Sequence, residues 1–112
     1  MALSTVHGFP RIGPNRELKF ATEGYWRGDT SAEDLKRTAR EIRRANWELM
    51  RDAGIDLIPS NDFSLYDQVL DTAALVGAVP ERYGHTGGPV DLDTYFAMAR
   101  GTQDATAMEM TK

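Results

Sequence analysis

One feature restricts the possible folds more than any other. It is a long amphipathic segment, followed by a single glycine and a short apolar run. Residues 30–53 place apolar or small side chains three and four positions apart, which predicts one helix with a buried stripe. Capping boxes beginning at Thr30 and at Ser31 mark its start, and Gly54 would end it. Residues 55–60, IDLIPS, then read as a strand, in the order typical of α/β proteins. The predicted stripe consists of Leu35, Ala39, Ile42, Asn46, Leu49 and Ala53.

The start of the chain predicts another strand and a shorter helix. Residues 3–9 are β-branched and largely apolar, and a Gly-Phe-Pro sequence ends this run. A helix is expected over residues 16–26, with the side chain of Asn15 as its cap. Because the strand at 55–60 returns after a helical crossover, it should lie parallel to the strand at 3–9.

The second half of the chain predicts two more helices. Ser64 is expected to cap a helix over residues 65–76. Residues 77–90 are broken by glycines and prolines and read as an extended surface connection. Asp91 is expected to cap the last helix, over residues 92–100, which a glycine follows.

These elements do not make a complete fold. Two parallel strands without further neighbours cannot form an independently stable sheet. The length of 112 residues is also too short for a whole (β/α)8 barrel, which typically needs roughly 250 residues. We therefore expect a mostly helical part of a larger α/β protein, or a chain that associates with another chain.

Composition excludes several classes of function. The net charge of −4 gives no general reason to expect a nucleic-acid partner, and no apolar stretch approaches the length of a membrane span. The N-terminal residues lack the pattern of a signal peptide. The absence of cysteine removes disulfides and thiolate metal sites, and it fits the reducing cytoplasm. With only His7 and His85 available, a zinc site in this chain would need carboxylates for its other ligands.

A turn with two cations is the strongest candidate for a binding site. Arg16 and Lys19 lie three residues apart, so on a helix they would share one face. The Gly-Pro-Asn turn before them would leave backbone N–H groups free at a helix N-terminus, which favours an anion. A carboxylate or phosphate ligand is one interpretation of this pattern, and a solvated surface pair is the other.

Two further charged clusters each allow a functional and a structural interpretation. Asp67 and Asp71 are four residues apart and offer either acid–base or metal chemistry, or an ordinary helix surface. Tyr66 beside them is expected in the core, with a place in a pocket as the alternative. The long helix carries a basic face, which suits solvent better than a nucleic acid: Lys36, Arg37, Arg40, Arg43, Arg44 and Arg51.

Four stretches together resemble one enzyme family. They are GFPRIGPNRELKFA at 8–21, IPSNDFSLYDQVLDT at 58–72, DLDTYFAMARG at 91–101 and AMEMTK at 107–112. Their order and their amino-acid sequences resemble the amino-terminal end of cobalamin-independent methionine synthases. This family moves a methyl group from 5-methyltetrahydropteroyltriglutamate to homocysteine and so forms methionine. The resemblance implies two face-to-face (β/α)8 barrels, with residues 1–112 as the opening portion of the first.

The resemblance also implies where substrates and cofactor bind. Arg16 and Lys19 match the family's RELK positions, which contact the glutamate tail of the folate, and Lys112 matches the lysine of its EMTK motif. These three residues would bind the tail, and no catalytic residue is expected in this chain. A zinc ion in the carboxyl-terminal barrel would activate homocysteine through ligands outside this chain, without cobalamin. We expect this part to bind no metal or cofactor itself.

The expected role of the chain alone follows from these assignments. As a partial amino-terminal barrel domain of a cytoplasmic enzyme it would be inactive by itself, with a folate polyglutamate as its ligand. Homocysteine would be reached only through the missing barrel, and neither a nucleic acid nor a membrane is expected as a partner. Two alternatives remain open: a non-catalytic binding module, and a structural unit that associates with itself through unpaired sheet edges.

Overall fold

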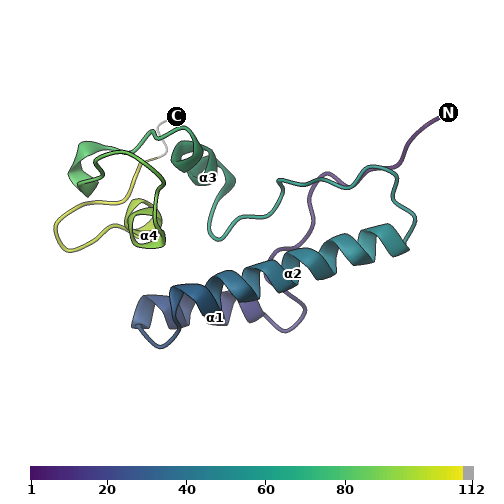
Figure 1. Ribbon diagram of the computed structural model, residues 1–112, viewed down its shortest axis with the longest axis horizontal. Helices are drawn as coiled ribbons and strands as arrows, with labels where there is room; N and C mark the ends of the chain where they lie inside the picture. Colours follow the sequence, from purple (N-terminus) through teal and green to yellow (C-terminus); the bar gives the residue numbers. More distant parts are fainter. Residues whose placement is uncertain (110–112) are drawn as a thin grey trace. The chain divides into compact units, whose positions relative to one another are not determined.

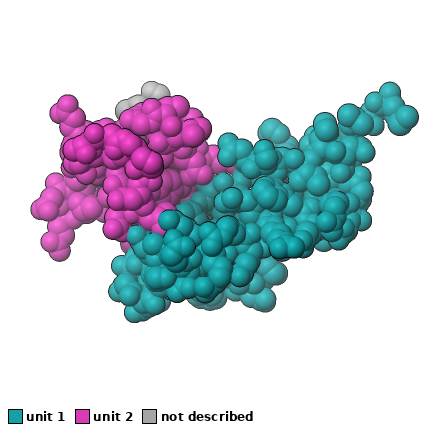
Figure 2. Space-filling view, in the orientation of Figure 1, with its two compact units in different colours: residues 1–65 teal, residues 66–112 magenta. Residues whose placement is uncertain are grey.

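The computed structural model describes residues 1–109 (Figure 1). Within this range it contains four α-helices, one short 3-10 helix and no strand. The chain divides into two compact units, Met1–Leu65 and Tyr66–Lys112, which are coloured separately in Figure 2. No helix in the described range has both the length and the apolar character needed to cross a membrane.

Unit 1 is built on two helices that lie side by side, α1 (Glu17–Arg27) and α2 (Ala32–Asp52) (Figure 1). Leu18 of α1 and Leu35 of α2 are fully buried in the core of this unit. As one of the two capping boxes predicts, Ser31 caps α2, and its hydroxyl accepts a hydrogen bond from the Asp34 N–H at 3.1 Å.

The predicted stripe on α2 is correct for its first half. Leu35, Ala39 and Ile42 are buried, but Leu49 is 59% exposed and Met50 is buried in its place. The two helix lengths explain this limit: α1 has 11 residues and α2 has 21, so the C-terminal turns of α2 extend past α1 (Figure 1). Ala53, which was also expected in the stripe, is exposed for the same reason.

The two predicted strands do not form within the described residues. Segments 3–9 and 55–60 meet in a single parallel bridge between Thr5 and Leu57, where the Leu57 N–H donates to the Ser4 carbonyl at 2.9 Å. The parallel direction is as predicted, and the extended ladder is not. Leu57 remains 53% exposed, because within the described residues no third strand extends this pair into a sheet.

Unit 2 contains α3 (Gln68–Leu75), η1 (Glu81–Tyr83) and α4 (Leu92–Arg100). The last helix has the predicted bounds, and the Asp91 carboxylate caps it by accepting from the Thr94 N–H at 2.7 Å. The predicted surface connection at 77–90 includes the short helix η1. The core of this unit consists of Leu70, Tyr95, Phe96 and Met98.

The start of α3 differs from the prediction. Asp67 rather than Ser64 caps the helix, and its carboxylate accepts from the Leu70 N–H at 2.9 Å. The phenol oxygen of Tyr95 accepts from the main-chain N–H groups of Tyr66 (3.1 Å) and Asp67 (3.4 Å). This tertiary contact uses the N–H groups at the point where the predicted helix would have begun, so α3 starts later.

Tyr95→Phe should destabilise unit 2 by about 1–3 kcal/mol, the usual cost of leaving buried partners unsatisfied. The Tyr95 hydroxyl donates to the Asp71 carboxylate while accepting the two N–H groups, and the side chain is buried. Burial and this carboxylate raise the pKa of Tyr95 well above its usual range. Urea unfolding would measure the loss. Tyr83→Phe, which removes a hydroxyl bonded only to the Thr106 carbonyl, is the control and should cost less.

Ser4→Ala should raise the pKa of Asp56 toward its ordinary value. The Ser4 N–H and hydroxyl both donate to the Asp56 carboxylate, at 2.8 and 3.0 Å, and they lower its pKa. Because the folded pKa is lowered, this contact stabilises the bridge above the ordinary pKa of aspartate and is lost as pH falls through the lowered value. Ser4→Ala keeps the hydrogen bond from the main-chain N–H of residue 4 to Asp56, so the pKa of Asp56 should rise only part of the way.

A carboxyl NMR titration would measure this change. Thr5→Val is the matched control, because its hydroxyl donates to the Leu57 carbonyl and not to a carboxylate. An unchanged Asp56 pKa in the serine variant would contradict the assignment.

Candidate functional site

The main chain before the cationic turn is held from two directions within unit 1. The Phe9 N–H donates to the Asp62 carboxylate at 3.1 Å. The side-chain amide of Asn46, on α2, donates to the Pro10 carbonyl at 3.0 Å. Asn46 was expected to be part of the buried stripe, and it is half-buried with this polar role. The GFPRIG segment is therefore fixed before it enters the turn.

The turn leads into α1 through a strained residue. Arg16 is the N-cap of α1 and adopts the left-handed conformation, with φ 60° and ψ 31°. Among the described residues it is the only non-glycine with a positive φ. Its N–H donates to the Gly13 carbonyl at 3.2 Å, which closes the turn. The prediction that Asn15 caps the helix is wrong, since no side chain caps α1.

Glu17, the first residue of α1, reaches back to the turn. Its carboxylate accepts from the Asn15 main-chain N–H at 3.1 Å and from the Asn15 side-chain amide at 3.3 Å. The same carboxylate fills the space beside Gly13, where an added Cβ would lie 2.1 Å from its Oε2. The sequence interpretation missed Glu17 as a structural partner. The sequence feature that indicates this contact is an acidic residue two positions after the asparagine of the Gly-Pro-Asn turn.

Some backbone N–H groups at the start of α1 already donate hydrogen bonds to carbonyl groups of this chain. The Leu18 N–H donates to the Ile12 carbonyl at 2.9 Å, and the Phe20 N–H donates to the Arg16 carbonyl at 3.1 Å. The Phe20 bond is the first bond of the helix itself, so two of the four N–H groups that precede it, those of Arg16 and Leu18, have partners in the preceding segment. Side-chain cations, rather than a ring of free amides, are what this turn offers to an anion.

The two predicted cations lie on this one turn. Arg16 is exposed and precedes the helix, so the expectation that it shares a helix face with Lys19 is not met. Lys19 is exposed in the first turn of α1, and its Nζ lies 3.6 Å from a carboxylate oxygen of Glu23 and 5.7 Å from the Phe20 ring centre. The third predicted cation, Lys112, lies outside the described residues.

A shallow hollow of about 370 Å³ lies beside the turn, between it and α2. Glu17 contributes to its wall, and neither Arg16 nor Lys19 is among the residues that line it. The cations therefore project from an open surface in this part of the chain. The residues that line the hollow are Pro14, Glu17, Thr38, Glu41, Ile42, Ala45 and Asn46.

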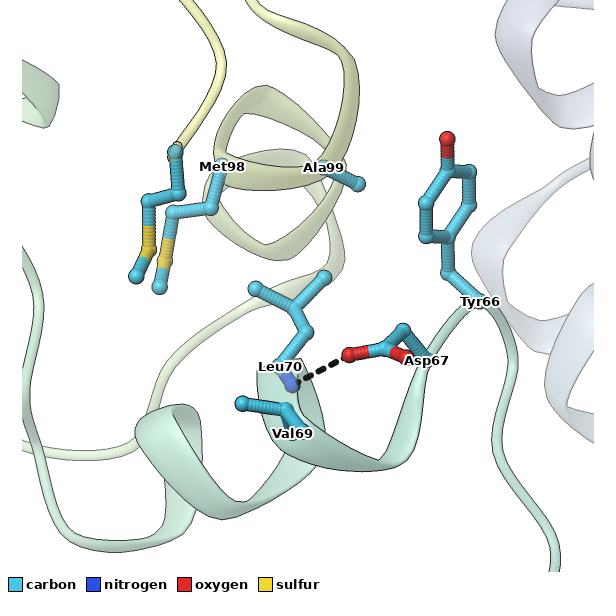
Figure 3. Close-up of a pocket in the computed structure, with 7 residues that line it drawn as sticks. Tyr66, Asp67, Val69, Leu70, Met98 and Ala99 are labelled. Atoms are coloured by element: carbon cyan, nitrogen blue, oxygen red, sulfur yellow. Dashed lines mark hydrogen bonds between the residues drawn. The ribbon is translucent and has the colours of Figure 1, made fainter. Parts of the chain in front are cut away.

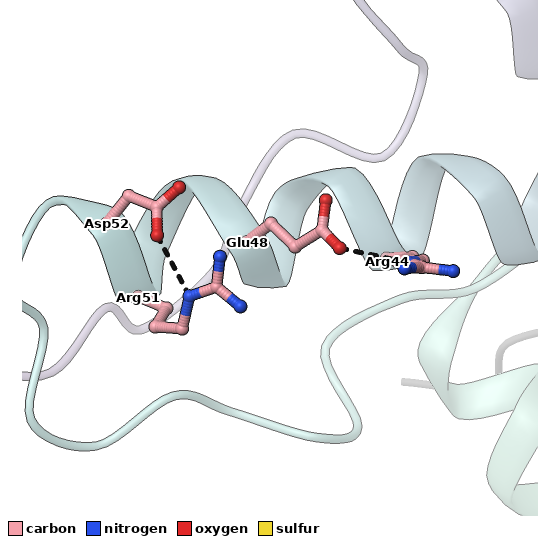
Figure 4. Close-up of polar contacts among 4 residues, drawn as sticks. All are labelled: Arg44, Glu48, Arg51 and Asp52. Atoms are coloured by element: carbon pink, nitrogen blue, oxygen red, sulfur yellow. Dashed lines mark hydrogen bonds and ion pairs between the residues drawn. The ribbon is translucent and has the colours of Figure 1, made fainter.

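Neighbouring carboxylates offset much of the charge along the basic face of α2. The Arg44 Nε lies 2.9 Å from Glu48, and the Arg51 Nε lies 2.8 Å from Asp52 (Figure 4). Hydrogen bonds to these carboxylates raise the pKa of both arginines. Nearer the start of the helix, Arg37 pairs with Asp34 at 2.7 Å, and Arg43 stacks over the Phe63 ring at 4.9 Å.

The paired carboxylates of unit 2 serve its structure. Asp67 caps α3, and Asp71 accepts the Tyr95 hydroxyl. Beside them a pocket of about 310 Å³ is formed by α3, α4 and the segment that carries Met108 (Figure 3). Tyr66 lines this pocket and is 41% exposed, so its predicted place in the core is wrong. In the described residues, no group of three or more histidine or acidic side chains is arranged to hold a metal ion.

Comparison with known proteins gives a match over nearly the whole chain. A family model described as "Cobalamin-independent synthase, N-terminal domain" matches residues 3–112. A protein of Oryza sativa subsp. japonica is 61% identical over 97% of this chain, and one of Mesembryanthemum crystallinum is 59% identical over the same share. A protein of Streptomyces coelicolor is 57% identical over 99% of this chain.

The names and lengths of these relatives bear on function. All three are called 5-methyltetrahydropteroyltriglutamate–homocysteine methyltransferase, the first with the number 1. The chain spans 14% of the length of each of them. Most of what such a methyltransferase contains therefore lies outside this sequence.

The strain at Arg16 can be tested by a pair of substitutions. A residue with a Cβ disfavours the left-handed conformation by about 1–2 kcal/mol, whereas the extra freedom of glycine in the unfolded chain costs about 0.5–1 kcal/mol. Arg16→Gly should therefore be more stable than Arg16→Ala by about 0.5–1 kcal/mol in urea unfolding. At Lys19, which lies within α1, the alanine variant should be the more stable of the two. The same order at both positions would contradict the assignment.

Proposed function

The chain belongs to the cobalamin-independent methionine synthase family, and from this premise we propose that it binds the glutamate tail of a folate substrate. Its relatives are named as methyltransferases for a triglutamate folate and homocysteine. We propose the same reaction for the whole protein: transfer of the folate methyl group to the homocysteine sulfur, which forms methionine. The chain would form the opening part of the amino-terminal barrel and be inactive alone.

The exposed cationic turn is the observation that carries the proposal. A triglutamate tail is a short chain of carboxylates, and charge-assisted hydrogen bonds to Arg and Lys are the strong ones available to it. Arg16 and Lys19 are both exposed and stand within four residues of each other on a turn that is fixed by hydrogen bonds. A rigid turn holds its cations in place before the ligand arrives, which lowers the entropy lost on binding.

The ion pair between Lys19 and Glu23 does not oppose this role. Both side chains are substantially exposed, at 46% and 37%, and the pair is separated by four residues on the helix. Exposed pairs of this kind typically contribute only about 0.3–0.5 kcal/mol. Lys19 also has three N–H donors, so it can bind a substrate carboxylate while it keeps or exchanges Glu23.

Lys112 is proposed as a third cation for the tail. The proposal for this residue rests on the family motif EMTK, since Lys112 lies outside the described residues.

The zinc expected in the parent enzyme would be held by residues beyond this chain. The sequence has no cysteine, and its described residues do not bring three potential ligands together, so they do not fit a zinc site. We therefore assign no step of the reaction to this chain and propose that it acts by binding alone. A cytoplasmic location is part of the same proposal.

Self-association is a second candidate, favoured by the apolar surface of α3. Val69 is 54% exposed, Leu75 is 82% exposed and Val76, at the end of the helix, is 70% exposed. In a whole barrel such side chains would be covered by neighbouring elements. In the isolated chain a second copy would cover them instead. Light scattering would measure the molar mass of the isolated chain in solution. A monomer at high concentration would exclude self-association.

Lys19→Ala should weaken the use of triglutamyl folate by a full-length synthase that carries this sequence. Loss of one hydrogen bond to a charged group usually costs about 1.5–3 kcal/mol, so KM for that folate should rise roughly tenfold or more. KM for homocysteine should change little, because Lys19 is not proposed to contact it. Steady-state kinetics with each substrate varied would measure both values.

Lys36→Ala is the control for this experiment. Lys36 is an exposed lysine of α2 that pairs with Glu33 at 3.6 Å, as Lys19 pairs with Glu23. It lies outside the turn and should leave both KM values unchanged. An equal loss for both substrates in the Lys19 variant would count against the tail-binding role.

A further inference from the structure

We propose that Glu17 is a positioning residue, whose carboxylate holds the turn that presents Arg16 and Lys19 to the folate tail. The inference rests on the proposed tail-binding function and adds to it the group that sets the geometry of the cations. Glu17 itself would not touch the ligand. Its effect would be transmitted through the turn formed by residues 13–16.

The contacts of Glu17 are local and specific. One carboxylate oxygen accepts from the Asn15 main-chain N–H at 3.1 Å, and the other accepts from the Asn15 side-chain amide at 3.3 Å. These two bonds cross over Arg16, the residue between them in sequence. The carboxylate thus joins the start of α1 to the turn and restricts the backbone of Arg16 from both sides.

Arg16 needs such restraint because its conformation is unfavourable by itself. A non-glycine residue in the left-handed region persists when its surroundings determine it, and such residues cluster at functional sites. The Arg16 N–H is fixed on Gly13 and its carbonyl accepts from Phe20. With the bonds from Glu17 removed, the turn would gain access to the common right-handed conformation. That change would turn the arginine side chain away from its present direction.

Gly13 provides a second, independent way to disturb the same contact. Its φ is +91°, and a Cβ at this position would lie 2.1 Å from Glu17 Oε2. A single methyl group there would displace the carboxylate while Glu17 itself remained in the sequence, and the positive φ would strain the alanine backbone as well. The absence of a side chain at residue 13 is therefore part of how Glu17 reaches Asn15.

The charge of Glu17 distinguishes positioning from direct binding. A carboxylate beside Arg16 and Lys19 repels an anionic tail, so its charge by itself opposes binding. Its favourable effect must come from the hydrogen bonds to Asn15. Glutamine can still accept one of these bonds through its amide oxygen, whereas alanine accepts neither. Glu17→Gln should therefore preserve most of the function that Glu17→Ala removes.

The test uses the full-length synthase that carries this sequence, with triglutamyl and monoglutamyl methylfolate as the two probes. Glu17→Ala should raise KM for the triglutamyl folate roughly three- to tenfold, as expected for lost hydrogen bonds. Its kcat, its KM for homocysteine and its KM for the monoglutamyl folate should stay within about twofold. Glu17→Gln should resemble the unmodified enzyme, and Gly13→Ala should resemble Glu17→Ala.

Glu33→Ala is the matched control, because Glu33 is an exposed glutamate near the start of α2 that pairs with Lys36. It should leave every constant unchanged. If folded Glu17→Ala raised all KM values together, its effect would not be confined to tail binding, and the positioning role would be overturned. A normal triglutamyl KM in Glu17→Ala, or equal losses in the alanine and glutamine variants, would overturn it as well.

The inference and the proposed function fail in different ways. If Lys19→Ala and Arg16→Ala leave the triglutamyl KM unchanged, tail binding at this turn is wrong and Glu17 has nothing to position. If those variants weaken binding and Glu17→Ala does not, the site stands and the positioning role is wrong. Should Glu17→Ala fail to fold, the comparison of Gly13→Ala with Glu17→Gln decides the question.

Discussion

The hydrogen bonds that close the turn between Gly13 and Glu17 determine where Arg16 and Lys19 lie. The Gly13 carbonyl accepts from the Arg16 N–H, and the Glu17 carboxylate accepts from Asn15 on the other side. The carboxylate occupies the space that a side chain at residue 13 would need, so the absence of a side chain there allows it to reach Asn15. The same turn directs the chain into α1, whose Leu18 is fully buried in the core of unit 1.

In contrast to this closed turn, the two extended segments of unit 1 do not form a sheet within the described residues. The contact between Thr5 and Leu57 is parallel, yet it remains a single bridge. A parallel pair gains stability from strands on both sides and from helices that cover its faces. The described residues do not supply such neighbours, and side chains such as Leu57 stay exposed. The helices form because their contacts are mostly local.

This difference between local and distant contacts explains how much the sequence predicted. The caps Ser31 and Asp91 were predicted because each bonds an N–H three residues away. The start of α3 was wrong because it depends on the hydroxyl of Tyr95, nearly thirty residues further along the chain. The cations Arg16 and Lys19 were identifiable from their charge and spacing. The left-handed conformation of Arg16 was not, because it results from several contacts that close together around the turn.

The proposed function gives the strained backbone of Arg16 a role, since a flexible polyanion would then meet one cation outside the helix and one within it. Helical arginine and lysine side chains sample many rotamers, and ordering both chains and the ligand at once costs entropy. Here Arg16 is the N-cap and lies outside the helix, while Lys19 lies in the first turn of α1. Under the proposed function, a tail with several carboxylates would bind to both side chains. Strain at one residue, sustained by Glu17 and Gly13, is the local cost of that arrangement.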